Sequence, residues 1–200
     1  MPLSPPQERE LQHTRAITIH GYRRADGLYD IEAELADTKT YDFPNLHRGH
    51  VAVGEKVHGM FMRMTVTENL EIVSCEAATD FHPYATCPQA APNFARLAGM
   101  KIGRGFLSAV AGRVGGAQGC THLRELLQQM ATTAFQTVNP TRVKRAADAA
   151  GQVLPPGDVY DARISEHFGG AKGVLNSCLA YAEDGPLVKH RWPESYTGPD

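Results

Sequence analysis

The sequence predicts an α+β domain, in which an antiparallel meander of about four strands is covered on one face by helices. Apolar residues alternate with a period of two in the first half of the chain and recur at helical spacing in the second half. Strands that precede the helices, rather than alternate with them, are typical of this fold class. We expect a disordered lead at residues 1–12, the α+β domain at residues 13–140, and a linker helix with a small C-terminal extension at residues 141–200.

Two strand pairs account for the predicted sheet. The dipeptide Asp26-Gly27 is a hairpin signal, and alternating apolar positions flank it on both sides. In the second pair, His58 and the methionines that follow it at every second position fall on one face of a strand. The turn at residues 68–69 then leads into the returning strand, "LEIVSCEAATDF". The polar stretch "NLHRGHVAVGEK" between the two pairs is predicted to be a loop.

Three helices are predicted in the second half of the domain. "CPQAAPNFARLAG" has prolines early and a glycine late, and "IGRGFLSAVAGRVGG" ends at a pair of glycines. The third helix opens at "GCTHL" and carries a stripe of leucines, Met130 and Ala134 at helical spacing. After Pro140 the chain becomes charged and rich in alanine, which indicates a change of element.

Composition limits the classes of partner. The net charge of the 200 residues is −2, with acidic and basic residues interspersed, so no basic surface for nucleic acid is indicated. No apolar run is long enough for a membrane span, and the polar, proline-rich start has no secretory signal. We therefore expect a cytoplasmic protein with a small-molecule substrate and neither a nucleic-acid nor a membrane partner, and we leave a homodimer open.

Side chains that bind metals or act as nucleophiles gather in three regions, each at the end of a predicted strand or the start of a predicted helix. A thiol at a helix N-terminus is held toward thiolate by the helix dipole, and thiolate is the form that binds metal or attacks an electrophile. The spacing matches no strong zinc signature, but the residue types suit Zn²⁺ or Fe²⁺. The candidate residues are His58; Asp80, His82, Tyr84 and Cys87; and Cys120 with His122.

Each of these residues also has an ordinary structural interpretation. His58 on its methionine-rich face could be a core histidine, and Cys87 could simply begin a helix. Cys75 and Cys178 are expected to be buried, inert thiols. Arg24, in the predicted hairpin, could receive a substrate carboxylate, although pairing with its acidic neighbours is equally natural there.

Long stretches of the sequence resemble a bacterial domain family of unknown function. The resemblance covers roughly residues 13–140 and the closing "RWP" region, and it is carried by "GYRRADGLYDIEAELADTK", "HPYATCPQAAPNFARLAGMKIGRGF" and "GGAQGCTHLRELLQQMATTAFQ". Members of that family often accompany the breakdown of aromatic acids or coenzyme A thioesters, so the resemblance implies a role in such catabolism.

The chain is also similar, more distantly, to the U-type iron–sulfur scaffold proteins. "GEKVHGM", "YATCPQAAPNFARLAGMKIG" and "GCTHL" follow the order of their three ligand segments. The similarity implies ligand positions at His58, at Cys87 or Asp80, and at Cys120, with His122 near the scaffold's histidine. Histidine replaces the first cysteine here, and Met60 stands where the scaffold has an aspartate. A site with at most two thiolates suits one Zn²⁺ or Fe²⁺ better than an all-cysteine cluster.

These observations lead to one principal functional hypothesis and three alternatives. The principal hypothesis is a metal-dependent hydrolase or lyase that acts on an aromatic acid or its thioester. The alternatives are a metal-free enzyme with Cys120 as nucleophile, an iron–sulfur or zinc carrier without turnover, and a structural domain with inert cysteines. In the principal hypothesis the metal ligands are His58, Cys87 and Cys120; the catalytic groups are Cys120, His122 and Asp80; and Tyr84 and Arg24 position the substrate.

Overall fold

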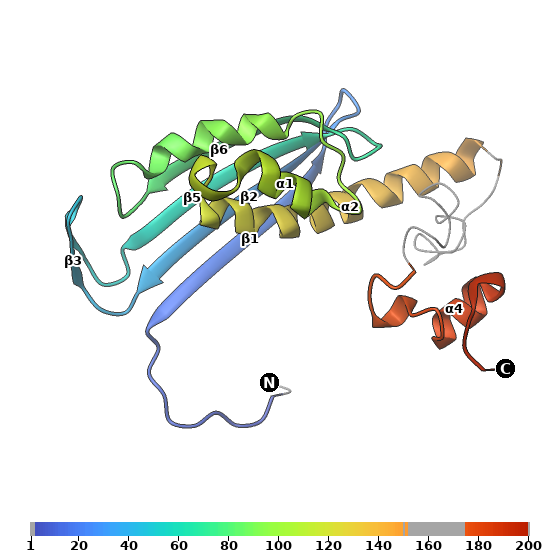
Figure 1. Cartoon of the computed structure of the whole chain (residues 1–200), viewed down its shortest axis with the longest axis horizontal. Coiled ribbons are helices and arrows are strands. Elements are labelled where there is room, and N and C mark those ends of the chain that lie inside the picture. The colour runs from blue at the N-terminus through green and yellow to red at the C-terminus, as the bar shows by residue number, and fades with distance from the viewer. Residues whose placement is uncertain (1–2, 150, 152–174, 200) are drawn as a thin grey trace. The chain divides into compact units, whose positions relative to one another are not determined.

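The main sheet has four antiparallel strands in the order β1-β2-β5-β6 (Figure 1). The computed structural model describes residues 3–149, 151 and 175–199, and it confirms the predicted α+β class. The part of the predicted extension at residues 152–174 lies outside the described residues. The strands of the sheet are β1 (His13–Arg23), β2 (Tyr29–Lys39), β5 (Lys56–Val66) and β6 (Ile72–Phe81).

Both predicted hairpins form. The ladder between β1 and β2 starts at the pair Arg23–Tyr29, so the turn contains Asp26 and Gly27, and Gly27 has the positive φ of +88° that glycine tolerates best. Between β5 and β6 the chain turns at residues 67–71, where Leu70 also has a positive φ. The sheet is thus a simple meander of neighbouring strands.

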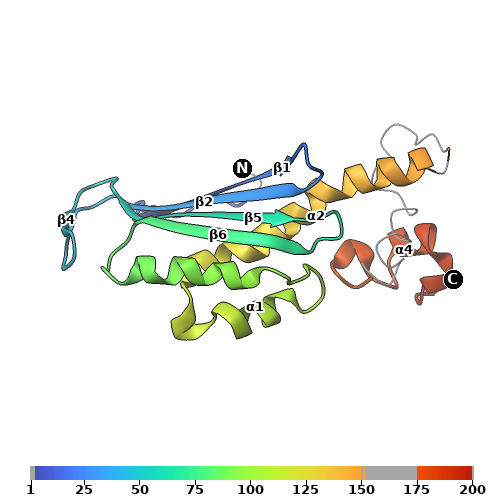
Figure 2. The same cartoon turned by 90° about the horizontal axis from the view of Figure 1, so that it is seen from above.

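The core lies between one face of the sheet and the helices (Figure 2). On β2 every second side chain is buried, and on β5 the same alternation holds from Met60 to Met64, as the period-2 pattern predicts. The first part of the long helix α2 (Thr121–Ala149) supplies the facing apolar stripe. The fully buried side chains include Ile31, Leu35, Met60, Met64, Phe94, Leu97, Leu123, Leu126, Leu127 and Met130.

The helical half differs from the prediction in two respects. The segment that begins at Cys87 is a 3₁₀-helix, η1 (Cys87–Leu97), with Pro92 in its middle. The helix α1 (Phe106–Val114) ends before two glycines, as expected, and a 3₁₀ turn, η2 (Gly116–Gln118), follows it. Helix α2 does not stop near Pro140 but continues to Ala149.

The predicted loop between the strand pairs contains a small hairpin, β3 (Phe43–Asn45) and β4 (Gly49–Val51). Its Asn45 side chain accepts hydrogen bonds from two backbone N–H groups of the turn. Arg48 ties the hairpin to the main sheet, because its guanidinium donates to the Lys56 carbonyl (2.7 Å) and pairs with Glu55. The sequence prediction missed this hairpin because its strands are only three residues long.

The chain divides into two compact units, Met1–Val138 and Asn139–Asp200. Within the described part of the second unit, short helical segments follow one another: η5 (Leu179–Tyr181), α4 (Pro186–Arg191) and η6 (Pro193–Ser195). None of the helices in the described ranges has the length and apolar character needed to cross a bilayer.

Gly21 sets how closely β1 approaches α2. A Cβ atom at this position would lie 1.9 Å from the Thr137 Oγ1 atom and 2.9 Å from its Cβ. We expect Gly21→Ala to lower the free energy of unfolding by about 1–3 kcal/mol, since the strand and helix must move apart. Thr137→Ala should restore part of this loss in the double variant. Urea unfolding of the two single variants and the double variant measures the coupling, and strictly additive losses would contradict the contact.

Candidate functional site

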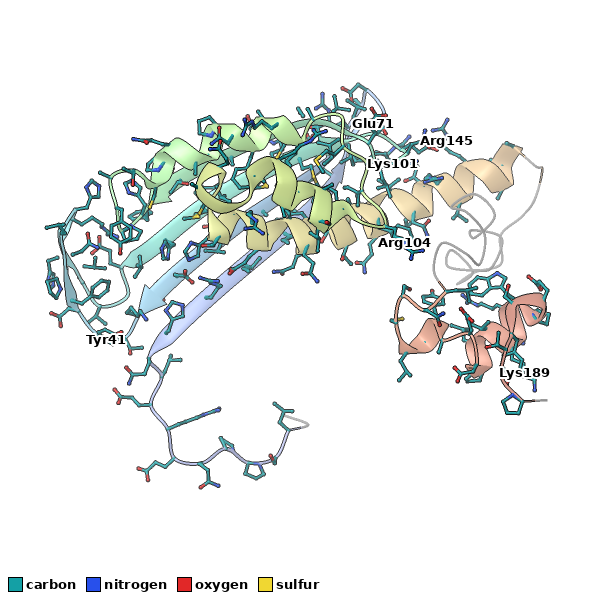
Figure 3. All side chains as sticks on the ribbon, in the orientation of Figure 1. Tyr41, Glu71, Lys101, Arg104, Arg145 and Lys189 are labelled. Carbon is teal, nitrogen blue, oxygen red and sulfur yellow. The ribbon has the colours of Figure 1, made fainter. Side chains whose placement is uncertain are left out.

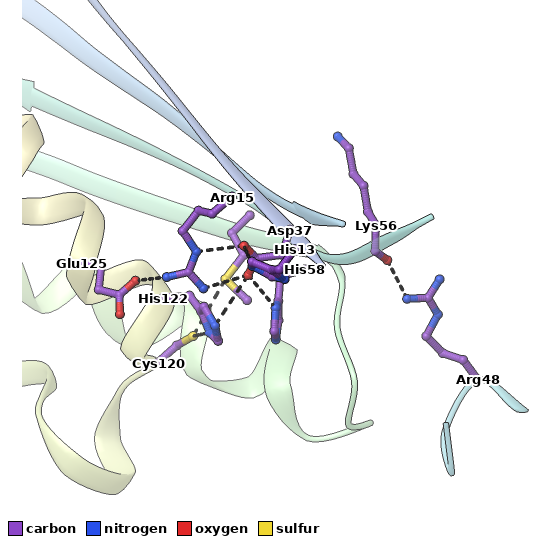
Figure 4. A network of polar contacts seen from close by, with 10 residues as sticks. His13, Arg15, Asp37, Arg48, Lys56, His58, Cys120, His122 and Glu125 are labelled. Carbon is purple, nitrogen blue, oxygen red and sulfur yellow. Dashed lines mark hydrogen bonds and ion pairs between the residues drawn. The ribbon is translucent and has the colours of Figure 1, made fainter. Parts of the chain in front are cut away.

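Asp37 is the centre of a polar cluster at one end of the sheet (Figure 4). The alternation of β2 turns the side chains of residues 29, 31, 33 and 35 toward the helices, and residue 37 continues this series. The chain therefore places a carboxylate where its pattern otherwise places apolar groups, and the Asp37 side chain is only 1% exposed. A buried carboxylate requires hydrogen-bonding and charged partners.

The first partner is Arg15, which stands opposite Asp37 in the β1–β2 ladder. Its Nε donates to Asp37 Oδ1 and its Nη2 donates to Oδ2, both at 2.8 Å, which is the two-pronged geometry of a strong arginine–carboxylate pair. His13 Nε2 lies 3.2 Å from Oδ1. The remaining Arg15 nitrogen, Nη1, donates to Glu125 Oε2 of α2 at 2.5 Å.

On the other side, His58 of β5 stands opposite Asp37, and its Nδ1 lies 2.9 Å from Oδ2. The ladder is irregular here, because the next pair joins Thr38 to Lys56 and leaves Val57 as an extra residue. Such a bulge re-aims the neighbouring side chains. Arg15, Asp37 and His58 thus form a row across three adjacent strands, on the face that carries the helices.

Helix α2 adds His122 and, just before its first residue, Cys120. The His122 ring lies over the His58 ring with centroids 3.9 Å apart, and its Nε2 is 3.8 Å from Asp37 Oδ2. Cys120 Sγ is 3.9 Å from His122 Nδ1 and 3.8 Å from the sulfur of Met60. The start of α2 therefore places an imidazole and a thiol near the Asp37 carboxylate, although these residues follow the sheet strands by some 40 residues or more in the chain.

The electrostatics keep the carboxylate charged and the two imidazoles neutral. Burial alone would raise the pKa of Asp37, but the hydrogen bonds and charge of Arg15, helped by His58, lower it to about 2. Burial lowers the pKa of His58, and Asp37 offsets only part of this effect. Burial also lowers the pKa of His122, and the neighbouring His58 and Arg15 lower it further. A charged carboxylate beside two neutral imidazoles is the protonation state that a metal ion requires.

The geometry of Asp37, His58 and His122 fits a metal ion. One oxygen or nitrogen atom from each of the three residues lies within 4.8 Å of the others. Donor atoms that share an ion at about 2.1 Å are themselves about 3–3.5 Å apart, so side-chain shifts of under an ångström would suffice. Arg15 binds the carboxylate from behind and orients it, as neighbouring hydrogen-bond donors do at metal sites.

Of the residues that the sequence nominated, the structure brings together His58, Cys120 and His122. Tyr84 lies in the loop that leaves β6, and Cys87 is the first residue of η1, where its N–H donates to the Tyr84 carbonyl. The Tyr84 side chain is exposed, and Asp80 is an exposed residue at a second bulge, between the pairs Gly59–Phe81 and Met60–Thr79.

Arg24 lies at the opposite end of β1 from the cluster. It pairs with Asp26 (2.6 Å) and Asp30 (3.5 Å). Arg24 is nine positions along the extended strand from Arg15, which corresponds to about 30 Å. In the structure, Arg24 therefore forms charge pairs with its acidic neighbours in the hairpin, as the alternative interpretation predicted.

Sequence reasoning missed Asp37, Arg15 and His13. A signal was present, because Asp37 extends the buried series of β2, and His13 and Arg15 extend the series of Ile17 and Ile19 on β1. A charged residue in the buried register of a strand indicates either the end of the strand or a buried polar site.

Acid should destabilise the metal-free protein through Asp37. Its pKa is lower in the folded state (about 2) than the ordinary value of 3.8, so its contribution is present above about pH 4 and is lost as the pH falls toward 2. We expect a loss of about 2 kcal/mol in the free energy of unfolding over this range. Urea unfolding in a chelator between pH 6 and pH 2 measures it. Asp37→Asn should flatten the curve in this interval, and an unchanged slope would contradict the assignment.

The comparisons with known proteins give one match. No curated protein and no solved structure matches the chain. A family model described as a protein of unknown function, DUF2889, matches residues 13–136. This range contains the whole cluster, from His13 on β1 to Glu125 on α2. The chain therefore belongs to the DUF2889 family.

Proposed function

We propose that this protein is a metal-dependent enzyme whose Asp37, His58 and His122 bind one Zn²⁺ or Fe²⁺ ion. The observation that carries the proposal is the convergence of their donor atoms within 4.8 Å, from two strands and a helix. Two imidazoles and one carboxylate form a donor set for either metal, with coordination positions left for substrate or water. This set keeps the predicted ligand His58 and uses Asp37 and His122 in place of Cys87 and Cys120.

The expected reaction is a hydrolysis or lyase reaction on a small organic acid or its thioester, in the cytoplasm. A bound ion would polarise the substrate carbonyl and lower the pKa of water. The chain's own residues would hold the carboxylate ligand through Arg15 and place the Cys120 thiol beside the reacting group. All four cysteines are free thiols; Cys75 is buried, as expected, whereas Cys178 is exposed, so the expectation of a buried thiol was wrong for Cys178.

Metal content tests the proposal directly. The untagged protein, purified aerobically and anaerobically, should contain about one Zn or Fe per chain by mass spectrometry. His58→Ala and His122→Ala should lose the metal, whereas Cys120→Ser and the exposed control His50→Ala should keep it. If the wild type binds neither metal even after incubation with each ion, the proposal is wrong. Loss of metal in Cys120→Ser but not in His122→Ala would favour the thiolate ligand set.

A second candidate function is a metal-free enzyme with Cys120 as nucleophile. The observation in its favour is the line of atoms from Cys120 Sγ to His122 Nδ1 (3.9 Å) and from His122 Nε2 to Asp37 (3.8 Å). An imidazole between a thiol and a carboxylate is the arrangement of cysteine–histidine enzymes. In that case iodoacetamide should alkylate Cys120 fastest among the thiols, and His122→Ala should slow the reaction at least tenfold. Equal alkylation rates of Cys120 in the wild type and in His122→Ala would exclude the metal-free enzyme.

A carrier role, which the scaffold resemblance implies, stays a prediction. Cys75, one of the four thiols, is unsuited to it, because burial raises its pKa to about 12. Acid-labile sulfide, measured on the same anaerobic preparations, distinguishes an iron–sulfur cluster from a single ion.

A further inference from the structure

Met60 and Cys120 place two sulfur atoms next to the cluster around Asp37. Cys120 Sγ is 3.8 Å from Met60 Sδ and 3.9 Å from His122 Nδ1, so the thiol contacts both a thioether and an imidazole nitrogen. Figure 4 shows Cys120 and His122 side by side at the start of α2. Sulfur atoms also lie among the side chains where the helices cover the sheet (Figure 3). The ion proposed at Asp37 uses neither Met60 nor Cys120.

The backbone brings these groups together in two matched pairs. His58 and Met60 are two residues apart on one face of β5, and Cys120 and His122 are two residues apart at the start of α2. The His122 ring lies over the His58 ring, and the Cys120 thiol contacts the Met60 thioether. Bulges interrupt both ladders of β5 here, one with β2 and one with β6. Bulges are frequent beside functional sites, because they re-aim side chains.

The distances fit a metal ion with three ligands. Bonds of about 2.3 Å to sulfur and about 2.0 Å to nitrogen, as the d¹⁰ ion Zn²⁺ makes, place two sulfurs about 4.0 Å apart around a trigonal ion. The same bonds place a sulfur and a nitrogen about 3.7 Å apart. The observed separations of 3.8 Å and 3.9 Å each differ from these values by about 0.2 Å. A trigonal ion therefore requires no rearrangement of the backbone.

The donor types select a soft ion with a single charge. Thiolate and thioether are soft ligands that favour Cu(I), whereas carboxylate and imidazole suit the harder ion proposed at Asp37. The Cys120 thiol would lose its proton to water, and the thiolate would neutralise the charge of Cu(I). This lowers the cost of placing the ion beside Met60, which is 1% exposed. Cys120 and His122 are only half-buried, so the ion can reach the sulfur pair from solvent.

We propose that Met60, Cys120 and Nδ1 of His122 bind one Cu(I) ion, a site that goes beyond the proposed enzyme function. It does not require an ion at Asp37. With Cu(I) on Nδ1, the ring proton of His122 stays on Nε2, which faces Asp37 Oδ2 at 3.8 Å. Metal-bound histidines commonly direct their other N–H toward a carboxylate. Because a neutral imidazole has one free lone pair, an ion bound through Nε2 would compete with Cu(I).

Anaerobic titration with Cu(I), against a competing chromophoric Cu(I) ligand, tests the proposal on the full chain freed of other metals. We expect about one Cu(I) per chain, and copper X-ray absorption should show two sulfur ligands and one nitrogen ligand. Met60→Leu preserves the volume of the buried side chain, so it should fold, weaken Cu(I) binding at least tenfold and remove one sulfur from the spectrum. Met64→Leu is the matched control. It changes an equally buried methionine about 13 Å further along β5 and should bind Cu(I) normally.

Three further variants separate this site from the other thiols and from the Asp37 site. Cys120→Ser should abolish Cu(I) binding, and Cys178→Ser, which removes the exposed thiol, should retain it. His58→Ala should lose Zn²⁺ but keep Cu(I), whereas Met60→Leu should lose Cu(I) but keep Zn²⁺, so failure of one site is distinguishable from failure of the other. The proposal is overturned if the wild type takes no copper from the competing ligand, if Met60→Leu binds Cu(I) as tightly as the wild type, if the bound copper has fewer than two sulfur ligands, or if Cys178→Ser loses the ion.

Discussion

Asp37→Asn is expected to weaken metal binding at least 100-fold and to lower the free energy of unfolding by about 2–3 kcal/mol. The amide keeps the size of the side chain but removes the charge that Arg15 and His58 both contact. The new amide also points its NH₂ group toward Arg15 or His58, each of which contacts a carboxylate oxygen in the wild type. Isothermal titration with Zn²⁺ measures the first effect, and urea unfolding in a chelator measures the second.

Two variants show whether the effect belongs to the cluster. Asp80→Asn removes an exposed carboxylate at the same end of the sheet and should change both quantities little, about 0.5 kcal/mol or less in stability. Arg15→Lys keeps the charge behind Asp37 but loses the fork that fixes both carboxylate oxygens, so metal affinity should fall while stability changes less. Asp37→Asn with normal metal affinity would exclude Asp37 as a ligand.

Leu126→Ala is expected to have the largest effect on stability, a loss of about 2–5 kcal/mol. Leu126 is fully buried, and it follows His122 by one helical turn on the same face of α2. The cavity would also let α2 shift relative to the sheet, so metal affinity should fall even though no ligand is changed. Thermal unfolding and zinc titration on the same variant measure both quantities.

Gln129→Ala is the matched control, since residue 129 lies on the exposed side of the same helix. It should change stability by less than about 0.5 kcal/mol and leave metal affinity unaltered. If Leu126→Ala lost stability but kept full metal affinity, the position of His122 would not depend on the packing of α2.

The meander and the helical cover could be predicted because their signals are local. The hairpin dipeptide at residues 26–27, the alternation of buried residues on β2 and β5, and the leucine stripe of α2 each determine the local structure within a few residues. Pro140 misled the prediction, because an interior proline usually ends or kinks a helix, whereas α2 continues through it to Ala149. The buried neighbours Val138 and Asn139 fit a helix that continues past this point.

Only three residues of the cluster could be identified from the sequence. Cys120 and His122 stood out because they lie together at a helix start, and His58 because it belongs to an otherwise apolar strand face. Asp37 resembled the surface charges around it, and only its register on β2 distinguishes it. The row of Arg15, Asp37 and His58 depends on strand pairing across 21 and 22 residues, and the bulge at Val57 adjusts that pairing. The local sequence around each of these residues does not show which strand positions pair with one another.

The cluster residues come from β1, β2, β5 and the start of α2, so the site is complete only when all four elements have packed together. Asp37 and His58 can meet as soon as β2 and β5 pair, but His122 joins them only when α2 packs on the sheet, 64 residues beyond His58 in the chain. Contacts of such long range form late, because the chain must close a large loop first. A nascent chain that ends before residue 121 would contain two of the three proposed metal ligands, Asp37 and His58, and would bind metal weakly. The finished domain would contain all three ligands. The ion would then bind tightly only after α2 has packed on the sheet, and the bound ion would slow unfolding.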